Sequence, residues 1–459
     1  MFMRKNSYLM LLFVLIILLV TLKLSDLGDI SWDESVYIGM GKYLVSAGNI
    51  GLWEALRPVG LPFVLGLLWI GGLNIIYTAK LIGLLFSIGC LVMTYLLGKK
   101  LFNGKTAIIS AMLLFIAPIF FINSSAVLTD IPSLFFALTS IYLFIDKKLF
   151  LAGVFAAISF LFRFPQGILF VALLISQLIN KKIEKQAIWG FILTLLPFFV
   201  FNFFMYKNPF IPFTTAYEHQ FNAVYSVISN TFLSYLYNLF YYPIWIIKQN
   251  ILLLFSLAGI YFIIKDKNKK SNILLMVVLL FTGYFTFIIN KQPRFLIIFL
   301  PYICILAAHG ILQVANIINP KYLKNAFFIL MIIAGVVFSY AYGDYNSIKQ
   351  DKLGEEFYNF FSHNYTNMTI LSTTPIPIAY SNIKMIPLYN NVDDALLIYE
   401  KEKNNVNFIM YTSEFYPCFD SLCEEKKQSL FESINNTNQL IYYKKGSQEY
   451  YLFKTYTTQ

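Results

Sequence analysis

Long apolar runs separated by short clusters of lysine constrain this chain more than any other feature. Of its 459 residues, 58% are hydrophobic and only 13% are charged. A helix that crosses a bilayer needs about 20 predominantly apolar residues, and many runs here approach that length. A soluble domain does not carry so few charges on so much apolar sequence. The pattern therefore predicts an all-α, polytopic membrane bundle.

The formal net charge of +11 comes mostly from lysines in short loops between the apolar runs. Lysine in short loops sets membrane orientation and attracts anionic lipid. We therefore expect membrane lipids as partners and no nucleic acid.

Lysine placement also fixes the predicted topology. The first apolar run, residues 6–22, follows Arg4 and Lys5 and has no small-residue cleavage site, which predicts a retained helix with a cytoplasmic amino end. Run 58–70 is too short to cross, and with it counted as a partial segment every later lysine cluster falls on the cytoplasmic side. This reasoning predicts eleven spans in a multi-pass cell-membrane protein. The later spans are expected at 76–98, 106–121, 131–145, 149–163, 165–180, 187–206, 245–264, 272–290, 295–317 and 325–341.

The tail has a different composition, rich in Asn, Lys, Glu, Tyr and Thr. Apolar strands at 369–371 and 407–411 alternate with a helical pattern at 424–434, which is typical of a small α/β domain. The predicted domains are a membrane domain, 1–342, with outer loops 23–75 and 207–244, and a soluble extracytoplasmic domain, 343–459. Loop 207–244 is rich in aromatic residues, and we expect a helix lying on the membrane surface there.

Cysteine usage agrees with an extracytoplasmic tail. Cys418 and Cys423 lie five residues apart in this polar segment. In an oxidising compartment such a pair is expected to form a disulfide.

Three carboxylates fall on the predicted outer face. Asp33 and Glu34 follow the first apolar run, and Asp130 begins a later one. Ionised carboxylates at a membrane surface can act as a base or bind a metal ion. Asp130 also has a purely structural explanation, because a carboxylate stabilises a helix amino end.

Basic residues gather on the same face. The chain has only four arginines, and three of them, Arg57, Arg163 and Arg294, lie at predicted outer ends of membrane segments beside prolines. The arginine guanidinium binds phosphate through two hydrogen bonds, so we predict phosphate binding by at least one of them, with Lys291 nearby. The alternative is that each caps a helix or extends to the interface.

Three further residues are weaker candidates for an acceptor site or a lid. Tyr37 follows the carboxylate pair, and Glu218 and His219 lie together in the aromatic outer loop. Aromatic-rich loops often contain such pairs without any chemical role.

The ordered set of motifs resembles the C-type glycosyltransferases that use polyprenyl-phosphate sugars, such as protein O-mannosyltransferases and lipid A aminoarabinose transferases. The matching segments are Trp32-Asp33-Glu34-Ser35-Val36-Tyr37, Arg57-Pro58-Val59-Gly60-Leu61-Pro62, Thr129-Asp130-Ile131-Pro132 and Lys291-Gln292-Pro293-Arg294-Phe295. The resemblance covers roughly residues 1–340. It departs at Pro58-Val59, where the family often has two prolines, and the tail carries no family motif.

This resemblance implies inverting transfer of a sugar from a dolichyl or undecaprenyl phosphate to a hydroxyl of a protein, glycan or lipid acceptor. Asp33 would be the base, and the arginines with Lys291 would bind the donor phosphate. Asp33, Asp130 and an arginine are therefore expected to meet in one cavity on the outer face. Glu34 or Asp130 would orient Asp33 or hold a divalent cation such as Mg²⁺ or Mn²⁺, although a metal is not obligatory. The alternatives are a transporter or flippase of polyprenyl-linked sugars and an oligosaccharide ligase.

Overall fold

The structure is a computed structural model that divides the chain into two compact units, described here one at a time. It describes residues 2–24, 30–179, 184–225, 232–268, 270–288, 291–318, 352–415, 418, 421–446 and 448–456. Unit 1 takes its residues from Met1–Asp26, Ala55–Gly60 and Leu81–Tyr345. Unit 2 takes its residues from Leu27–Glu54, Leu61–Lys80 and Asn346–Gln459.

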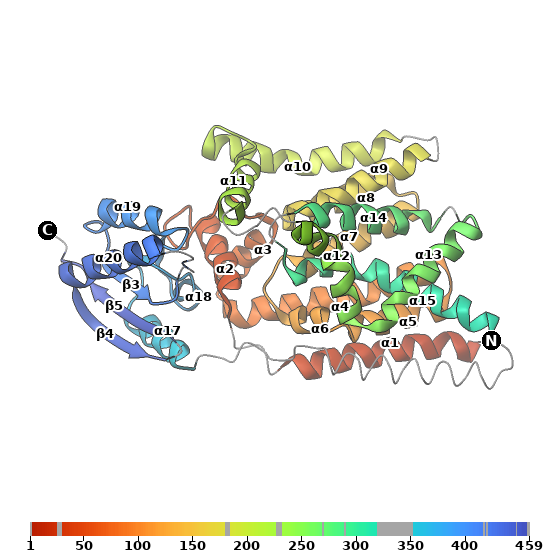
Figure 1. Ribbon diagram of the computed structural model, residues 1–459, viewed down its shortest axis with the longest axis horizontal. Helices are drawn as coiled ribbons and strands as arrows, with labels where there is room; N and C mark the ends of the chain where they lie inside the picture. Colours follow the sequence, from red (N-terminus) through yellow and green to blue (C-terminus); the bar gives the residue numbers. More distant parts are fainter. Residues whose placement is uncertain are drawn as a thin grey trace. The chain divides into compact units, whose positions relative to one another are not determined.

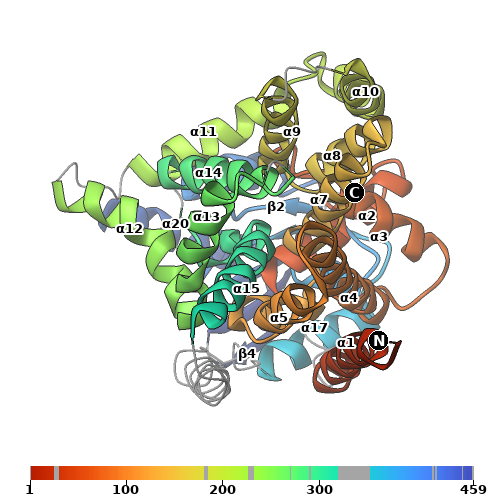
Figure 2. The ribbon, with the colours of Figure 1, turned by 90° about the vertical axis from the view of Figure 1, so that its right-hand side faces the viewer.

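Unit 1 is a helical bundle. Its helices are α1 (Phe2–Lys23), most of α4 (Ile75–Leu101), α5 (Gly104–Phe115), α6 (Pro118–Ile122), α7 (Asp130–Ile145), α8 (Leu149–Phe162), α9 (Gly167–Ile179), α10 (Lys185–Tyr206), α11 (Ile211–Tyr225), α12 (Phe232–Gln249), α13 (Phe255–Lys265), α14 (Asn272–Phe287) and α15 (Leu300–Ile317). Short 3₁₀ turns are η2 (Asn123–Ser125), η3 (Phe164–Gln166), η4 (Ile251–Leu254) and η5 (Pro293–Ile298). Helices such as α1, α9 and α10 run horizontally in Figure 1, whereas α11 and α12 are seen lengthwise in Figure 2.

Small residues allow a close helix crossing in this bundle. A methyl group added at Gly153 of α8 would collide with the backbone of Ala187 in α10, and one added at Gly190 of α10 would collide with the backbone of Phe150 in α8. Helices in membranes associate through such small residues, because lipid supplies no hydrophobic drive for their packing. The two glycines therefore allow α8 and α10 to pack closely together. Arg163 follows the carboxyl end of α8.

Three helices in the described part of the chain are long and apolar enough to cross a bilayer alone, namely α4, α10 and α15. A fourth span is possible if α5 and Pro118–Ser125, which are bent by 67°, are counted together. Several shorter apolar helices, including α7, α8, α9 and α14, match predicted spans in position. Eleven spans thus remain a prediction, and the mostly helical bundle is confirmed.

Four predicted spans are not single α-helices. Spans 165–180 and 295–317 begin in the 3₁₀ turns η3 and η5, and two others are interrupted farther along. Segment 106–121 bends after Phe115 because Pro118 cannot continue the helix. Segment 245–264 was predicted as one helix, which is wrong: α12 ends at Gln249, and the Asn250 side chain accepts a hydrogen bond from the Leu252 backbone N–H to start η4. The predicted span 325–341 lies outside the described residues.

Unit 2 contains a five-stranded sheet and the helices that cover it. Its strand order is β2-β1-β3-β5-β4, with β1 parallel to β2 and β3, and β5 antiparallel to β3 and β4. The strands are β1 (Thr369–Ser372), β2 (Lys384–Pro387), β3 (Phe408–Thr412), β4 (Gln439–Lys445) and β5 (Glu449–Lys454). The helices are α2 (Trp32–Val45), α3 (Gly60–Ile70), α17 (Lys352–Asn364), α18 (Pro377–Tyr380), α19 (Val392–Glu402) and α20 (Ser421–Thr437). The small α/β tail is thus confirmed.

The side chains of β3 point alternately to the two faces of the sheet, and their contacts show which helices cover each face. Phe408 and Met410 of β3 pack in one apolar cluster with residues of α17 and α2. Ile409 and Tyr411 of the same strand pack in another cluster with residues of α19 and α20. Successive side chains of a strand point to opposite faces, so α2 and α17 cover one face and α19 and α20 the other. Figure 1 shows α17 and α20 on opposite sides of the strands.

A buried lysine fixes α2 in this unit. The Lys42 side chain is only 2% exposed, and its Nζ donates hydrogen bonds to the carbonyl oxygens of Ile378 (2.7 Å) and Ser381 (3.0 Å). Burial lowers the pKa of Lys42 to about 7, because a charged ammonium is poorly solvated in an apolar core.

This lowered pKa predicts how stability depends on pH. The ordinary pKa of a lysine is 10.5, so between pH 7 and 10.5 the unfolded state binds more protons than the folded state. The free energy of unfolding of unit 2 should therefore rise with pH in that window, by at most about 1.4 kcal/mol per pH unit. Below pH 7 both states are protonated, and the contribution stops changing.

The control is Lys42→Gln, which keeps N–H donors but cannot titrate. Unfolding midpoints followed by tryptophan fluorescence in detergent should rise more steeply with pH for the wild type than for the variant. Equal slopes for the two proteins would contradict the assignment to Lys42.

Candidate functional site

In unit 1 the structure brings together Asp130 and Arg163, two of the predicted site residues. An Arg163 guanidinium nitrogen, Nη2, lies 3.2 Å from Oδ1 of Asp130, and the two side chains are 11% and 2% exposed. Nη1 of the same arginine donates a hydrogen bond to the Thr129 hydroxyl at 3.2 Å. Burying two charges costs desolvation free energy. A buried ion pair at two helix ends is therefore a candidate for a functional role.

Local sequence explains both positions. Asp130 is the first residue of α7, where a carboxylate is favoured by the positive helix end. Arg163 directly follows α8 in an extended conformation, with φ −158° and ψ 113°. Pro165 has no backbone N–H with which to continue the hydrogen bonds of α8, and a short 3₁₀ turn follows instead. The two helix ends therefore present opposite charges to each other.

Several buried polar atoms around this pair have no hydrogen-bond partner in the described structure. They are Oδ1 of Asp130, Nε of Arg163 and Oε1 of Gln166. The contact between Asp130 Oδ1 and Arg163 is thus a close charge pair rather than a hydrogen bond. Each such atom costs about 1–3 kcal/mol when left unpaired, and natural proteins keep few of them. A polar ligand bound here would relieve that cost.

Other basic segments lie beside Arg163. The ring of Phe295 lies 4.8 Å from the Arg163 guanidinium carbon, and Phe295 directly follows Arg294 in η5. A methyl group placed on Gly60 would lie 2.9 Å from the carbonyl oxygen of Leu161. Arg57 precedes that glycine by three residues, so the segments that carry Arg57 and Arg294 both lie beside the end of α8.

Lys291 has a structural task in the described chain. Its Nζ donates to the carbonyl oxygens of Phe285, Thr286 and Ile288 at 3.2, 2.7 and 2.5 Å, and so it caps the carboxyl end of α14. Partial burial lowers the pKa of Lys291 to about 8, so the amine is still mostly charged at pH 7. These bonds occupy its three hydrogens, which favours a capping role over direct phosphate binding.

In unit 2 the carboxylate pair begins α2. The Ser31 backbone N–H donates to Oε2 of Glu34 at 2.6 Å as part of a capping box, and Lys80 Nζ donates to Oε1 at 2.7 Å. Glu34 is 3% exposed. Both of its oxygens are therefore engaged in holding the helix start, whereas Asp33 in the same turn is half-buried.

The remaining candidates are more scattered. Tyr37 is buried in unit 2, and Glu218 is exposed on α11 in unit 1. The side chain of His219 lies outside the described part of the structure. Asp33 and Asp130 belong to different units, so their convergence in one outer cavity stays a prediction.

Sequence reasoning missed several polar residues. Lys80 was taken as one more residue of an apolar span, although a lysine far from any loop cluster signals a buried partner. Gln166 follows Arg163 by three residues, and its Nε2 donates to the Ser133 hydroxyl at 3.3 Å. A glutamine and a serine at such spacing within apolar runs are the signal that could have found them.

The predicted disulfide and a possible metal site are the remaining features. Cys418 and Cys423 form a disulfide. Within the described ranges, no three His, Cys, Asp or Glu side chains gather closely enough to hold a metal ion.

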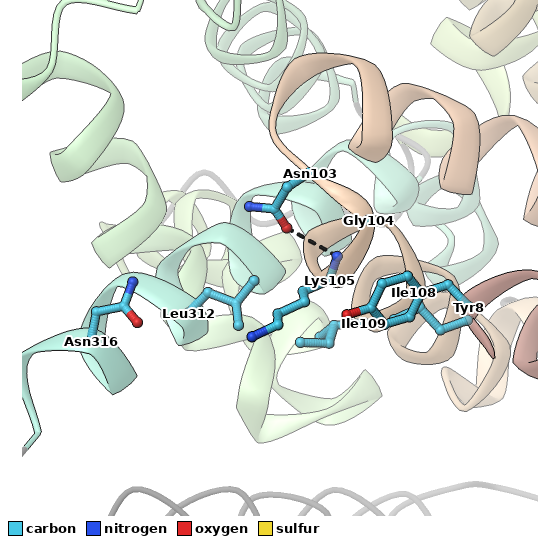
Figure 3. Close-up of a pocket in the computed structure, with 8 residues that line it drawn as sticks. All are labelled: Tyr8, Asn103, Gly104, Lys105, Ile108, Ile109, Leu312 and Asn316. Atoms are coloured by element: carbon cyan, nitrogen blue, oxygen red, sulfur yellow. Dashed lines mark hydrogen bonds between the residues drawn. The ribbon is translucent and has the colours of Figure 1, made fainter. Parts of the chain in front are cut away.

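A cavity of about 690 Å³ lies at the amino end of α5 in unit 1 (Figure 3). Asn103 begins that helix, and its side chain accepts hydrogen bonds from the backbone N–H groups of Lys105 and Thr106. The cavity is lined by Tyr8, Asn103, Gly104, Lys105, Ile108, Ile109, Leu312 and Asn316. It contains none of the predicted site residues.

Comparisons with known proteins agree on one type of fold. Residues 66–204 match the family described as dolichyl-phosphate-mannose-protein mannosyltransferase, and no curated protein sequence matches the chain. The structure is similar to ArnT from Cupriavidus metallidurans bound to undecaprenyl phosphate, with a TM-score of 0.66, 11% identity and 98% of each chain covered. It is also similar to the oligosaccharyltransferase AglB from Archaeoglobus fulgidus in complex with an inhibitory peptide and a dolichol-phosphate, with a TM-score of 0.59, 13% identity, and 98% of this chain and 74% of that chain covered.

Proposed function

We propose that this chain, which has the fold of the C-type glycosyltransferases, is a membrane enzyme that transfers a sugar from a polyprenyl phosphate to an acceptor hydroxyl on the outer face of the cell membrane. The observation that carries the proposal is the buried Asp130–Arg163 pair, in which the N–H donor Nε of Arg163 has no hydrogen-bond partner in the described structure. A phosphate group would satisfy the guanidinium of Arg163, since a phosphate accepts two parallel N–H donors from arginine. ArnT is bound to undecaprenyl phosphate and AglB to a dolichol-phosphate.

The proposed reaction is a single inverting displacement. The acceptor oxygen attacks the anomeric carbon of the sugar, and the bond from that carbon to the phosphate oxygen breaks. Asp33 takes the proton from the acceptor hydroxyl, and the polyprenyl phosphate leaves with the electron pair. Arg163, with Arg57 and Arg294 on neighbouring segments, stabilises the growing negative charge.

Asp130 has a positioning role in this proposal. Its carboxylate holds the Arg163 guanidinium at the end of α8. A divalent cation bound by Asp33 or Asp130 would supply similar charge stabilisation. Glu34 fits poorly as its ligand, because both oxygens already accept hydrogen bonds from Ser31 and Lys80.

The test is sugar transfer by the purified protein in lipid vesicles. Labelled undecaprenyl-phosphate and dolichyl-phosphate sugars serve as donors, host membrane extract serves as acceptor, and a parallel reaction contains a chelator. Labelled product from at least one donor supports the enzyme, and loss of product with the chelator assigns a metal. Movement of labelled lipid across the bilayer without any transfer would replace the proposal with a flippase, and transfer of only preassembled oligosaccharides would indicate a ligase.

A further inference from the structure

Helix α2, which carries Asp33, is built into the core of unit 2 and does not lie free beside it. Val36 and Met40 of α2 are fully buried in the same apolar cluster as Phe357 and Phe361 of α17 and Met410 of β3. Burying one such side chain contributes about 1.5–3 kcal/mol. The sheet formed by the tail therefore depends on α2 for part of its cover, and α2 depends on the tail.

The amino end of α2 is held through an aromatic contact. The ring of Trp32, the residue before Asp33, packs edge-to-face on Tyr389, with ring centroids 4.9 Å apart. The Tyr389 hydroxyl donates to a carboxylate oxygen of Glu54 at 2.9 Å. An edge-to-face pair contributes about 0.5–1.5 kcal/mol beyond its buried area, and it also fixes the orientation of both rings.

A side chain holds the carboxyl end of α2, and backbone hydrogen bonds hold the loop after it. Lys42 Nζ bonds to the carbonyl oxygens of Ile378 and Ser381 in and after α18. Gly51 then extends the sheet, because its N–H donates to the Ile383 carbonyl at 2.7 Å and its carbonyl accepts from the Met385 N–H at 2.9 Å. Contacts at both ends of α2 thus restrict its position relative to the sheet.

We infer that the C-terminal domain positions the catalytic carboxylate, with Tyr389 acting as a positioning residue for Asp33 through the ring of Trp32. The inference rests on the proposed function for the role of Asp33 and goes beyond it in the role of the domain. A domain that only selects the acceptor would not need to share a core with the helix that bears the base. A base displaced by about 1 Å can lower a rate by about 100-fold, so this packing controls catalysis.

The test compares Tyr389→Leu with Tyr389→Phe in the full-length protein. Leucine keeps an apolar side chain but removes the ring under Trp32, and phenylalanine keeps the ring and loses only the hydrogen bond to Glu54. We expect kcat to fall by about 10- to 100-fold in Tyr389→Leu, with the donor KM unchanged, and to stay within about threefold of wild type in Tyr389→Phe. Lys426→Met, which breaks the surface pair of Lys426 with Asp393 in the same domain, is the control and should behave as wild type.

Three results would overturn the inference. They are a Tyr389→Leu variant that raises only the acceptor KM, equal losses in the leucine and phenylalanine variants, and an equal loss in Lys426→Met. Hydrogen–deuterium exchange provides a readout that does not require activity. Residues 32–37 should exchange faster in Tyr389→Leu than in Lys426→Met, and unchanged exchange there would overturn the inference even if no donor supports transfer. Absence of transfer by the wild type, with the expected exchange pattern, would overturn the proposed function alone.

Discussion

Replacing Asp33 with asparagine is expected to lower the rate of sugar transfer by about 10²- to 10⁴-fold, the usual contribution of a general base. Asparagine keeps the size and a hydrogen-bonding oxygen but cannot accept the proton of the attacking hydroxyl. Binding of the polyprenyl phosphate should be unchanged, because the phosphate is proposed to bind to arginines of unit 1. Single-turnover transfer and binding of labelled undecaprenyl phosphate measure the two effects separately.

Glu34→Gln is the informative comparison for this variant. It removes the charge that pairs with the buried Lys80, so we expect a lower unfolding temperature rather than a selective loss of kcat. Breaking one partner of a buried pair costs about 3–5 kcal/mol. A Glu34→Gln protein that is as stable as wild type but inactive would reverse the two roles, and an active Asp33→Asn protein would eliminate Asp33 as the base.

The second large effect is expected for Arg163→Lys. Lysine preserves the positive charge next to Asp130, so the buried carboxylate keeps a partner and the fold should survive. It loses the planar fork that binds two phosphate oxygens. We expect kcat to fall by about 100-fold, the typical cost of losing one donor to a developing negative charge, and the affinity for undecaprenyl phosphate to fall as well.

Arg4→Lys is the matched control, because it makes the same substitution in the first helix at the predicted cytoplasmic end. It should leave both kcat and donor affinity unchanged. Full donor affinity and full activity in Arg163→Lys would show that the fork is not used and that Arg57 or Arg294 binds the phosphate instead.

Local patterns in the sequence predicted helix and strand positions well. Helix α7 begins at Asp130 and α8 ends at Phe162, each within one residue of the predicted boundary. The predicted strands at 369–371 and 407–411 correspond to β1 and β3. These helices and strands could be predicted because apolar runs, and the residues that end them, are visible within one short segment of sequence. The sequence also predicted that Asp33, Asp130 and an arginine would meet in one cavity. Of these residues, Asp130 and Arg163 lie together, and the meeting with Asp33 stays a prediction.

Partners that are distant in the sequence could not be predicted in the same way. Lys80 pairs with Glu34 across 46 residues, and nothing local to either residue identifies the other. The burial of α2 against the tail depends on which face of each strand meets which helix, and that choice is made only when the sheet assembles. The break at Asn250 was missed because the apolar residues on both sides of it read as one run.

The apolar core that α2 shares with the tail can form only late in synthesis, because its two parts are far apart in the sequence. Lys42 leaves the ribosome 336 residues before Ile378, whose carbonyl oxygen it binds. At about 5–20 residues per second this interval lasts on the order of tens of seconds. During that time α2 has none of the tail that later buries it, so the Asp33 turn can reach its final geometry only after β5 has been made. A chain that stopped before β3 would accordingly keep its apolar helices and yet lack the packing that orders the proposed base, so the proposed activity should begin only after the sheet of unit 2 has been made.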